Sequence, residues 1–196
     1  MAIKFQYNKV SLQEMQKQLK RRLDTLPVLK FKEAILRAET EKVKKEMEAL
    51  NNKVFKMIQD HEYLNILWHE FPLNIITVSE IKTSIKNIAG VKSPHFEGVN
   101  LELQVRCLFN SPFWIFDGAV LLKELIRLSI KKNIFLQRVE LLEAARKKTT
   151  QKVNLYQKIQ VPGYLDAISK IKSYLNDEES LSKATQKMMK KILLSI

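Results

Sequence analysis

One stretch decides the fold of this chain, residues 12–68, which read LQEMQKQLKRRLDTLPVLKFKEAILRAETEKVKKEMEALNNKVFKMIQDHEYLNILW. Alternate steps of three and four residues visit seventeen positions, and thirteen of them are apolar, as in the a/d seam of a coiled coil. These positions are Leu12, Met15, Leu19, Arg22, Leu26, Leu29, Glu33, Leu36, Thr40, Val43, Met47, Leu50, Val54, Met57, His61, Leu64 and Trp68. Between Pro27 and Pro72 no Gly or Pro occurs, so we expect one unbroken helix there.

A second seam follows later in the chain and supplies a partner for the first. Eight of its twelve positions are apolar, and no Gly or Pro occurs between Gly118 and Pro162. They are Leu121, Leu125, Leu128, Lys132, Phe135, Val139, Leu142, Arg146, Thr149, Val153, Tyr156 and Gln160. We therefore predict a mainly α fold, a long antiparallel two-helix coiled-coil hairpin. Counting from the closed end places Pro27 opposite Gly163, beside Pro162, where we expect the helix pair to bend.

The middle of the chain changes from helical to alternating periodicity. Residues 75–78 and 81–88 are rich in β-branched side chains, and residues 101–107 alternate apolar with polar, as in a half-buried strand. Gly90, Pro94 and Gly98 predict the turn between the last two strands. We therefore expect a small β-containing lobe at the closed end. The predicted segments are residues 1–71, 72–116 and 117–196, with the two terminal helices paired as one structural unit.

Local signals predict where the helices begin. Ser11 and Glu14 have capping-box spacing, so the first helix should start at Ser11 and the residues before it should be loose or extended. Asp117 is a candidate N-cap for the second helix. A further apolar stripe, Ile126, Ile130 and Ile134, lies off the seam. Either the lobe packs over this stripe or another protein chain docks on it.

The net charge of +13 is concentrated on the two predicted helices. Residues 1–60 hold 14 Lys/Arg and 8 Asp/Glu, and residues 117–196 hold 16 and 8, whereas residues 61–116 hold 4 and 5. Such an excess favours an acidic partner, which could be nucleic acid, an anionic membrane or acidic protein loops. A solvated coiled-coil surface is the alternative. Lys17, Lys20 and Arg21 form a basic collar near the first helix start, and Lys183, Lys187 and Lys191 share one face beside the apolar residues 192–196.

The sequence shows no pattern of an active site. Its four glycines lack phosphate-loop spacing, and His61, His69 and His95 lack metal-ligand spacing. Cys107, the single cysteine, alternates with polar residues in a predicted strand and fits a core position in a reducing compartment. We expect no catalytic residue, no cofactor and no metal site. No apolar run approaches membrane-spanning length, so we expect a cytoplasmic protein.

Three segments in order resemble the D subunit of the V-type (vacuolar/archaeal-type) ATPase and ATP synthase. The first is Asn8-Lys9 with Leu12, Leu19-Lys20 and residues 26–32. The second is Asn87-Ile88-Ala89-Gly90-Val91 followed by Pro94, and the third is Lys152-Val153-Asn154-Leu155 with Pro162. The resemblance therefore spans residues 8–162.

This resemblance implies a non-catalytic central rotor shaft that couples ATP hydrolysis or synthesis to ion translocation. Its terminal helices would enter a ring of alternating catalytic and non-catalytic head subunits (A and B). The expected head-bearing residues are Lys17, Lys20, Arg21, Lys152, Asn154, Lys183, Lys187 and Lys191. The lobe would contact the small F subunit and the membrane-facing funnel subunit (C/d type). Its expected contact residues are Asn87, Ile88, Gly90, Val91 and Pro94.

The chain would then lie in the cytoplasm, peripheral to the membrane and linked to it only through the complex. The alternative function is a basic helical-hairpin scaffold that binds nucleic acid or an anionic membrane surface. Aromatic residues are not interleaved with Lys and Arg on one face, which disfavours nucleic acid. The helices also lack a strong apolar face opposite the charge, which disfavours a membrane scaffold.

Overall fold

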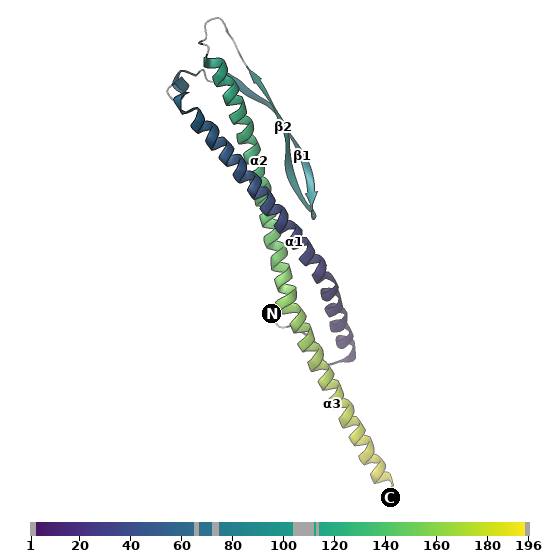
Figure 1. Ribbon diagram of the computed structural model, residues 1–196. Helices are drawn as coiled ribbons and strands as arrows, with labels where there is room; N and C mark the ends of the chain where they lie inside the picture. The colour runs from purple at the N-terminus through teal and green to yellow at the C-terminus, as the bar shows by residue number, and fades with distance from the viewer. Residues whose placement is uncertain (1–2, 65–66, 72–74, 104–111, 113, 195–196) are drawn as a thin grey trace. The chain divides into compact units, whose positions relative to one another are not determined.

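The computed structural model describes residues 3–64, 67–71, 75–103, 112 and 114–194, and these are mainly helical (Figure 1). The elements in chain order are α1 (Lys9–Asp60), η1 (Glu62–Leu64), η2 (Leu67–Glu70), β1 (Ile76–Ile88), β2 (Val91–Leu103), α2 (Trp114–Asn154), η3 (Leu155–Gln160) and α3 (Val161–Leu193). The predicted class, long helices with a small β-containing lobe, is confirmed.

The chain forms two compact units, each of which combines distant parts of the sequence. Unit 1 comprises residues 1–33 and 148–196, and unit 2 comprises residues 34–147. Both α1 and α2 contribute to both units. The predicted division into three consecutive segments follows the chain rather than these units, and it stays a prediction.

Both predicted seams are confirmed by burial. All fifteen described seam positions from Leu12 to His61 are buried or half-buried, and so are all twelve from Leu121 to Gln160. Most positions between them are exposed. In unit 2, five buried side chains form one apolar cluster: Leu36, Val43, Phe135, Val139 and Leu142. A three-four apolar pattern therefore selects the buried face of each helix.

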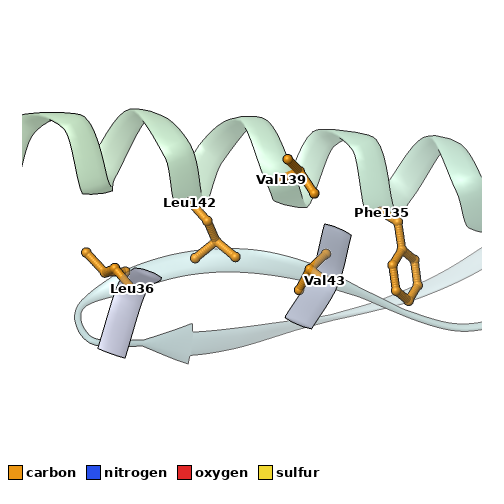
Figure 2. Packing of buried hydrophobic residues seen from close by; sticks show 5 residues of the cluster. All are labelled: Leu36, Val43, Phe135, Val139 and Leu142. Atoms are coloured by element: carbon orange, nitrogen blue, oxygen red, sulfur yellow. The ribbon is translucent and has the colours of Figure 1, made fainter. Parts of the chain in front are cut away.

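The unit 2 cluster shows that its helices run antiparallel. Leu142 of α2 lies toward the Leu36 end of the cluster, whereas Val139 and Phe135 lie toward the Val43 end (Figure 2). The order of contacts is thus opposite along the two helices. Leu36, Val43 and Leu142 are fully buried. Burying each such side chain contributes about 1.5–3 kcal/mol, so this cluster supplies much of the unit's stability.

The lobe is one β-hairpin in which β1 pairs antiparallel with β2 and Ile88 pairs with Val91. Its two turn residues, Ala89 and Gly90, have φ of 49° and 80°, which is typical of a type I′ turn. The predicted tight turn at Gly90 is therefore confirmed. Ala89 and Val91 also pack against the Leu36–Leu142 cluster, so the hairpin lies alongside α2 (Figure 1).

Two details of the lobe prediction are wrong. Pro94 and Gly98 lie within β2, paired with Ile85 and Lys82, rather than in the turn. A two-stranded sheet tolerates Pro because each strand has a free edge, and Gly98 lies beside a register shift, where glycine is common. The two predicted runs 75–78 and 81–88 are likewise one strand, because a second register shift near Ser79 keeps the pairing continuous. Residues 104–107 of the predicted strand, including Cys107, lie outside the described residues.

The first helix starts earlier and ends earlier than predicted. Asn8, not Ser11, is the cap, because its Oδ1 accepts a 2.6 Å bond from Ser11 N–H. Ser11 Oγ in turn accepts a bond from Gln6 N–H at 3.3 Å. At the other end α1 stops at Asp60. Asp60 and Glu62 are acidic near a helix C-terminus, where the macrodipole disfavours negative charge, and short 3₁₀ turns follow.

The second helix also starts before its predicted cap. It begins at Trp114, so Asp117 lies in its first turn, where a carboxylate still favours the helix dipole. On the off-seam stripe, Ile134 is buried and Ile126 and Ile130 are half-buried. Four residues further along this stripe, Arg138 contacts His95 of β2. Arg138 lies beyond the predicted stripe, so both alternatives for Ile126, Ile130 and Ile134 stay predictions.

Unit 1 has its own apolar cluster, built from Met15, Ile168 and Ile171. The segment before α1 adds to it, because Ile3 and Phe5 pack against these residues and Tyr7 stacks on Tyr174 with ring centroids 4.8 Å apart. The segment has no regular secondary structure, and it is packed rather than loose.

The predicted pairing of Pro27 with Gly163 is wrong, because Arg22 and Glu33, on either side of Pro27, bond to Tyr156 and Thr150. A Cβ built on Gly163 would lie 3.0 Å from Ile3 Cδ1, so the N-terminal segment occupies that position. Pro27 lies inside α1, which continues through it. Before Pro162, the second helix widens into a π-helix, η3, in which Val161 N–H donates to Tyr156 C=O. A π-turn relieves the clash of a proline ring with the preceding turn. The bend at this level stays a prediction.

Candidate interaction surfaces

The eight predicted head-bearing residues all belong to unit 1, and all eight are exposed. Three of them lie on α1, and the other five lie on α2 and α3: Lys17, Lys20, Arg21, Lys152, Asn154, Lys183, Lys187 and Lys191. Their exposure leaves the charges available to a partner. Whether they contact one stays a prediction.

The C-terminal part of α3 presents two different faces to its surroundings. Every described residue from Asn176 to Leu194 is exposed. At 100° per residue, Leu181, Met188 and Ile192 fall on one side of the helix. The basic side chains Lys183, Lys187, Lys190 and Lys191 fall away from that side. Lys183 Nζ also lies 2.7 Å from Glu179 Oε1, and this bond lowers the pKa of Glu179. The end of α3 is therefore an amphipathic, basic surface.

An open groove of 680 Å³ lies between the start of α1 and α3 in unit 1. Leu12 of α1 and Glu178 of α3 both line it. Lys9 and Lys172 contribute positive charge to it, and Glu178 and Glu179 contribute negative charge. Because the charges are mixed, the groove favours no single class of ligand.

The charged seam positions pair across unit 1. Arg22 Nη1 donates to Tyr156 Oη at 2.8 Å, and its guanidinium carbon lies 4.7 Å from the centroid of the same ring. Glu33 Oε1 accepts a bond from Thr150 Oγ1 at 3.3 Å. Both contacts join α1 to the second helix, so these polar residues set which levels of the helices face each other. The seam spacing identified Arg22 and Glu33, whereas their partners required the tertiary structure.

The predicted lobe residues all lie at the hairpin turn or beside it in unit 2. Asn87 and Gly90 are exposed, whereas Ile88, Val91 and Pro94 are half-buried. Val91 packs against the Leu36–Leu142 cluster, so the motif helps hold the hairpin on the helices. Only its exposed part is available to a partner, and a partner role for it stays a prediction.

Sequence reasoning missed a buried polar cluster in unit 2. Arg138 of α2 is 7% exposed and lies between Glu39 of α1 and His95 of β2. Arginine at an off-seam position gives no sequence signal of burial. Spacing alone could have placed Arg138 on the stripe with Ile134.

Other kinds of site find no support within the described residues. None of the described helices has an apolar stretch long enough to cross a membrane. In the same part of the chain, no group of three or more His, Cys, Asp or Glu side chains could hold a metal ion. The candidate sites are therefore surfaces rather than enclosed pockets.

Comparison with known proteins identifies the family of this chain. The family model described as the D subunit of ATP synthase matches residues 11–191. The chain belongs to the ATP synthase D subunit family. The match includes most of α1 and α3 and all of β1, β2, α2 and η3. The family thus covers both compact units.

Curated relatives agree over nearly their whole length. The V-type ATP synthase D subunit of Borreliella burgdorferi is 27% identical over 195 residues, 97% of this chain and 96% of the relative. The D subunit of Chlamydia pneumoniae is 27% identical over 186 residues, covering 90% and 88% of the two chains. That of Chlamydia muridarum is 29% identical over 171 residues, covering 85% and 84%. The resemblance stated for residues 8–162 is thereby confirmed and extended.

Proposed function

We propose that this chain is the central-stalk (rotor shaft) component of a V-type ATPase or ATP synthase. In that role it couples ATP hydrolysis or synthesis in the catalytic head to ion translocation across the membrane. The observation that carries the proposal is the D subunit family match over residues 11–191. The long paired helices with an exposed basic end support it physically, because they suit a shaft inside a ring of other proteins.

The shaft does no chemistry in this proposal. Torque passes along paired helices whose buried seams resist separation, while partners grip their outer faces. Rotation of an asymmetric shaft presents a different face to each catalytic interface in turn, which couples nucleotide state to shaft angle. Exposed ion pairs suit the sliding contact because each one is weak, about 0–1 kcal/mol in proteins generally.

The two units have different proposed partners. The catalytic and non-catalytic head subunits (A and B) contact unit 1, where the eight exposed head-bearing residues lie. The F subunit and the funnel subunit contact the hairpin of unit 2, where Asn87 and Gly90 are exposed. The chain then acts in the cytoplasmic, membrane-peripheral part of the complex and meets the membrane only through its partners.

Co-purification with the head subunits of its own complex tests this proposal. We expect a stable complex at about 0.5 M NaCl, and weaker head binding, by about tenfold or more, after charge reversal of Lys17, Lys20 and Arg21 to Glu. The matched control reverses Lys42, Lys45 and Lys53, which are equally exposed but lie in unit 2. Equal loss in both variants would contradict the assignment of unit 1 to the head. Salt-resistant binding to DNA or anionic vesicles, with none to the head, would overturn the stalk function.

Deletion of residues 183–196 tests the tail separately. The shaft should keep its helicity and thermal stability, because the described residues removed are all exposed. The head should still assemble, but ATP turnover should be less tightly coupled to ion transport. The reason is that the proposed head-bearing residues Lys183, Lys187 and Lys191 are lost. The ratio of ions moved to ATP hydrolysed in reconstituted vesicles measures this. An unchanged ratio would show that the tail is dispensable.

A further inference from the structure

Arg138 joins three elements of unit 2 through one buried guanidinium. Its Nη2 lies 2.5 Å from Glu39 Oε1 of α1, and its Nη1 lies 3.4 Å from His95 Nδ1 of β2. The Arg138 and Glu39 side chains are only 8% and 23% exposed. Removal of one partner of such a sheltered pair leaves the other charge buried without compensation. The protein is therefore more stable when the two charged groups stay in contact.

The contact with His95 depends on the protonation state of the imidazole. Guanidinium groups only donate hydrogen bonds, so Nδ1 must carry its lone pair and the ring must be neutral to accept one. A protonated His95 would instead place a second positive charge beside the guanidinium. The same pair of residues therefore attracts in one state of His95 and repels in the other.

We propose that Arg138 is a positioning residue that clamps the β1–β2 hairpin to α1 and α2, and that His95 makes this clamp release at acidic pH. The neutral pair fixes β2 on the helices and thereby fixes the exposed turn residues Asn87 and Gly90. Protonation of His95 loosens the attachment of β2 at Arg138, while the Leu36–Leu142 cluster keeps α1 and α2 paired and still holds Ala89 and Val91 of the hairpin turn. This device concerns the chain itself and does not require the stalk function.

The charges that face His95 come from every element around it. Burial, then Lys86 of β1 and Arg138 of α2, lower the pKa of His95 below its ordinary value of 6.5. Glu97 of β2 and Glu46 of α1 act in the opposite direction more weakly. Because the clamped state binds the proton less readily than the released state, clamping is strongest above pH 6.5 and weakens as the pH falls below it.

Hydrogen exchange of the full chain between pH 5 and pH 7.5, corrected for the intrinsic exchange rate, measures the release. Protection of the β1 amides should fall by up to about tenfold for each pH unit below 6.5, the limit set by one proton. Amides of α1 and α2 beside the Leu36–Leu142 cluster should keep their protection. Protection of β1 that does not depend on pH would overturn the proposal.

Three substitutions at two positions separate a clamp from a merely structural role. His95→Gln keeps a neutral side chain at every pH, so β1 protection should become independent of pH. Arg138→Lys keeps the charge and should retain the pH dependence, whereas Arg138→Met should lower β1 protection at pH 7.5. If the Met variant fails to fold, the His95→Gln result still decides. A pH dependence that persists in His95→Gln would refute the role of His95.

The chain has only three histidines, so NMR can follow each imidazole. The pKa of His95 should lie below its ordinary value of 6.5 in the wild type, and the titration midpoint should rise towards 6.5 when Arg138 is replaced by Met. Midpoints unchanged by that substitution would show that the guanidinium does not act on His95.

Discussion

The helices of the two compact units are held together by different kinds of contact. In unit 2 the helices meet through five aliphatic or aromatic side chains, and the buried charge of Arg138 sits beside that cluster. In unit 1 an apolar cluster around Ile171 is followed along the seam by the polar pairs of Arg22 with Tyr156 and Glu33 with Thr150. Apolar contacts are non-directional and proportional to area, whereas hydrogen bonds require particular atoms to meet. Unit 2 therefore gains stability from its seam, and unit 1 gains a defined helix register.

The largest expected effect is loss of apolar contact in unit 2. Leu142→Ala removes a fully buried side chain and should lower the free energy of unfolding by about 2–5 kcal/mol. Urea titration followed by circular dichroism measures it. The control is Leu136→Ala on the same helix, where the side chain is 42% exposed and the loss should be much smaller. Equal losses would mean that this cluster is not the main source of stability.

The next effect concerns the hairpin turn of unit 2. Gly90→Val places a β-branched residue at φ 80° and should cost about 1–2 kcal/mol. The control is Gly98→Val in the same hairpin, because no atom lies within 4 Å of a Cβ built there. Hydrogen exchange of β1 should increase in the first variant only, and both should keep their helicity. In the proposed complex, unchanged binding of the F subunit and the funnel subunit to the Gly90→Val variant would show that the turn is not part of that interface.

The polar seam of unit 1 should respond to loss of a single oxygen. Tyr156→Phe keeps the ring but removes the acceptor of Arg22 Nη1, at a cost of about 1–1.5 kcal/mol. Chemical denaturation measures this loss. Tyr63→Phe, at a 71% exposed position, should be nearly neutral. If Tyr156→Phe were as neutral as the control, the polar pairs of unit 1 would not contribute to its stability.

The smallest effect is the exposed ion pair of Lys44 with Glu143 in unit 2, whose charged atoms are 2.5 Å apart. The hydrogen bond to Lys44 lowers the pKa of Glu143 below 4.5. The pair therefore stabilises the fold above pH 4.5, and this contribution is lost as the pH falls through the folded pKa. Because both side chains are over 40% exposed, we expect less than about 1 kcal/mol. Lys44→Met should flatten the stability profile between pH 3 and pH 6, and an unchanged profile would contradict this.

Periodicity predicted the buried face of the helices well, because it depends only on residue spacing. Gly90 also predicted a turn, because glycine adopts positive φ readily, whereas Pro94 and Gly98 were wrongly assigned to the same turn. Helix ends were predicted less accurately. Asn8 and Ser11 are both good caps, and only the contacts of the preceding segment choose between them. The early end of α1 at Asp60 was not predicted, because the acidic residues there do not interrupt the apolar pattern.

The candidate surfaces, like the fold, could be predicted only in part from the sequence. The exposure of Lys17 follows from its position off the seam, and the structure agrees. The partners of these surfaces belong to the proposed complex, so no property of the single chain identifies them. The Arg138 cluster could not be predicted, because His95 and Glu39 lie 43 and 99 residues from Arg138 in sequence.

The sequence by itself determined the helical seams, a turn at Gly90 and the concentration of positive charge, because these follow from local spacing and composition. Tertiary structure alone decided that Ile3 packs at Gly163 and that Tyr156 accepts a hydrogen bond from Arg22. It also brought His95 to Arg138. Each of these contacts joins residues distant in the chain, and no local pattern encodes such a choice.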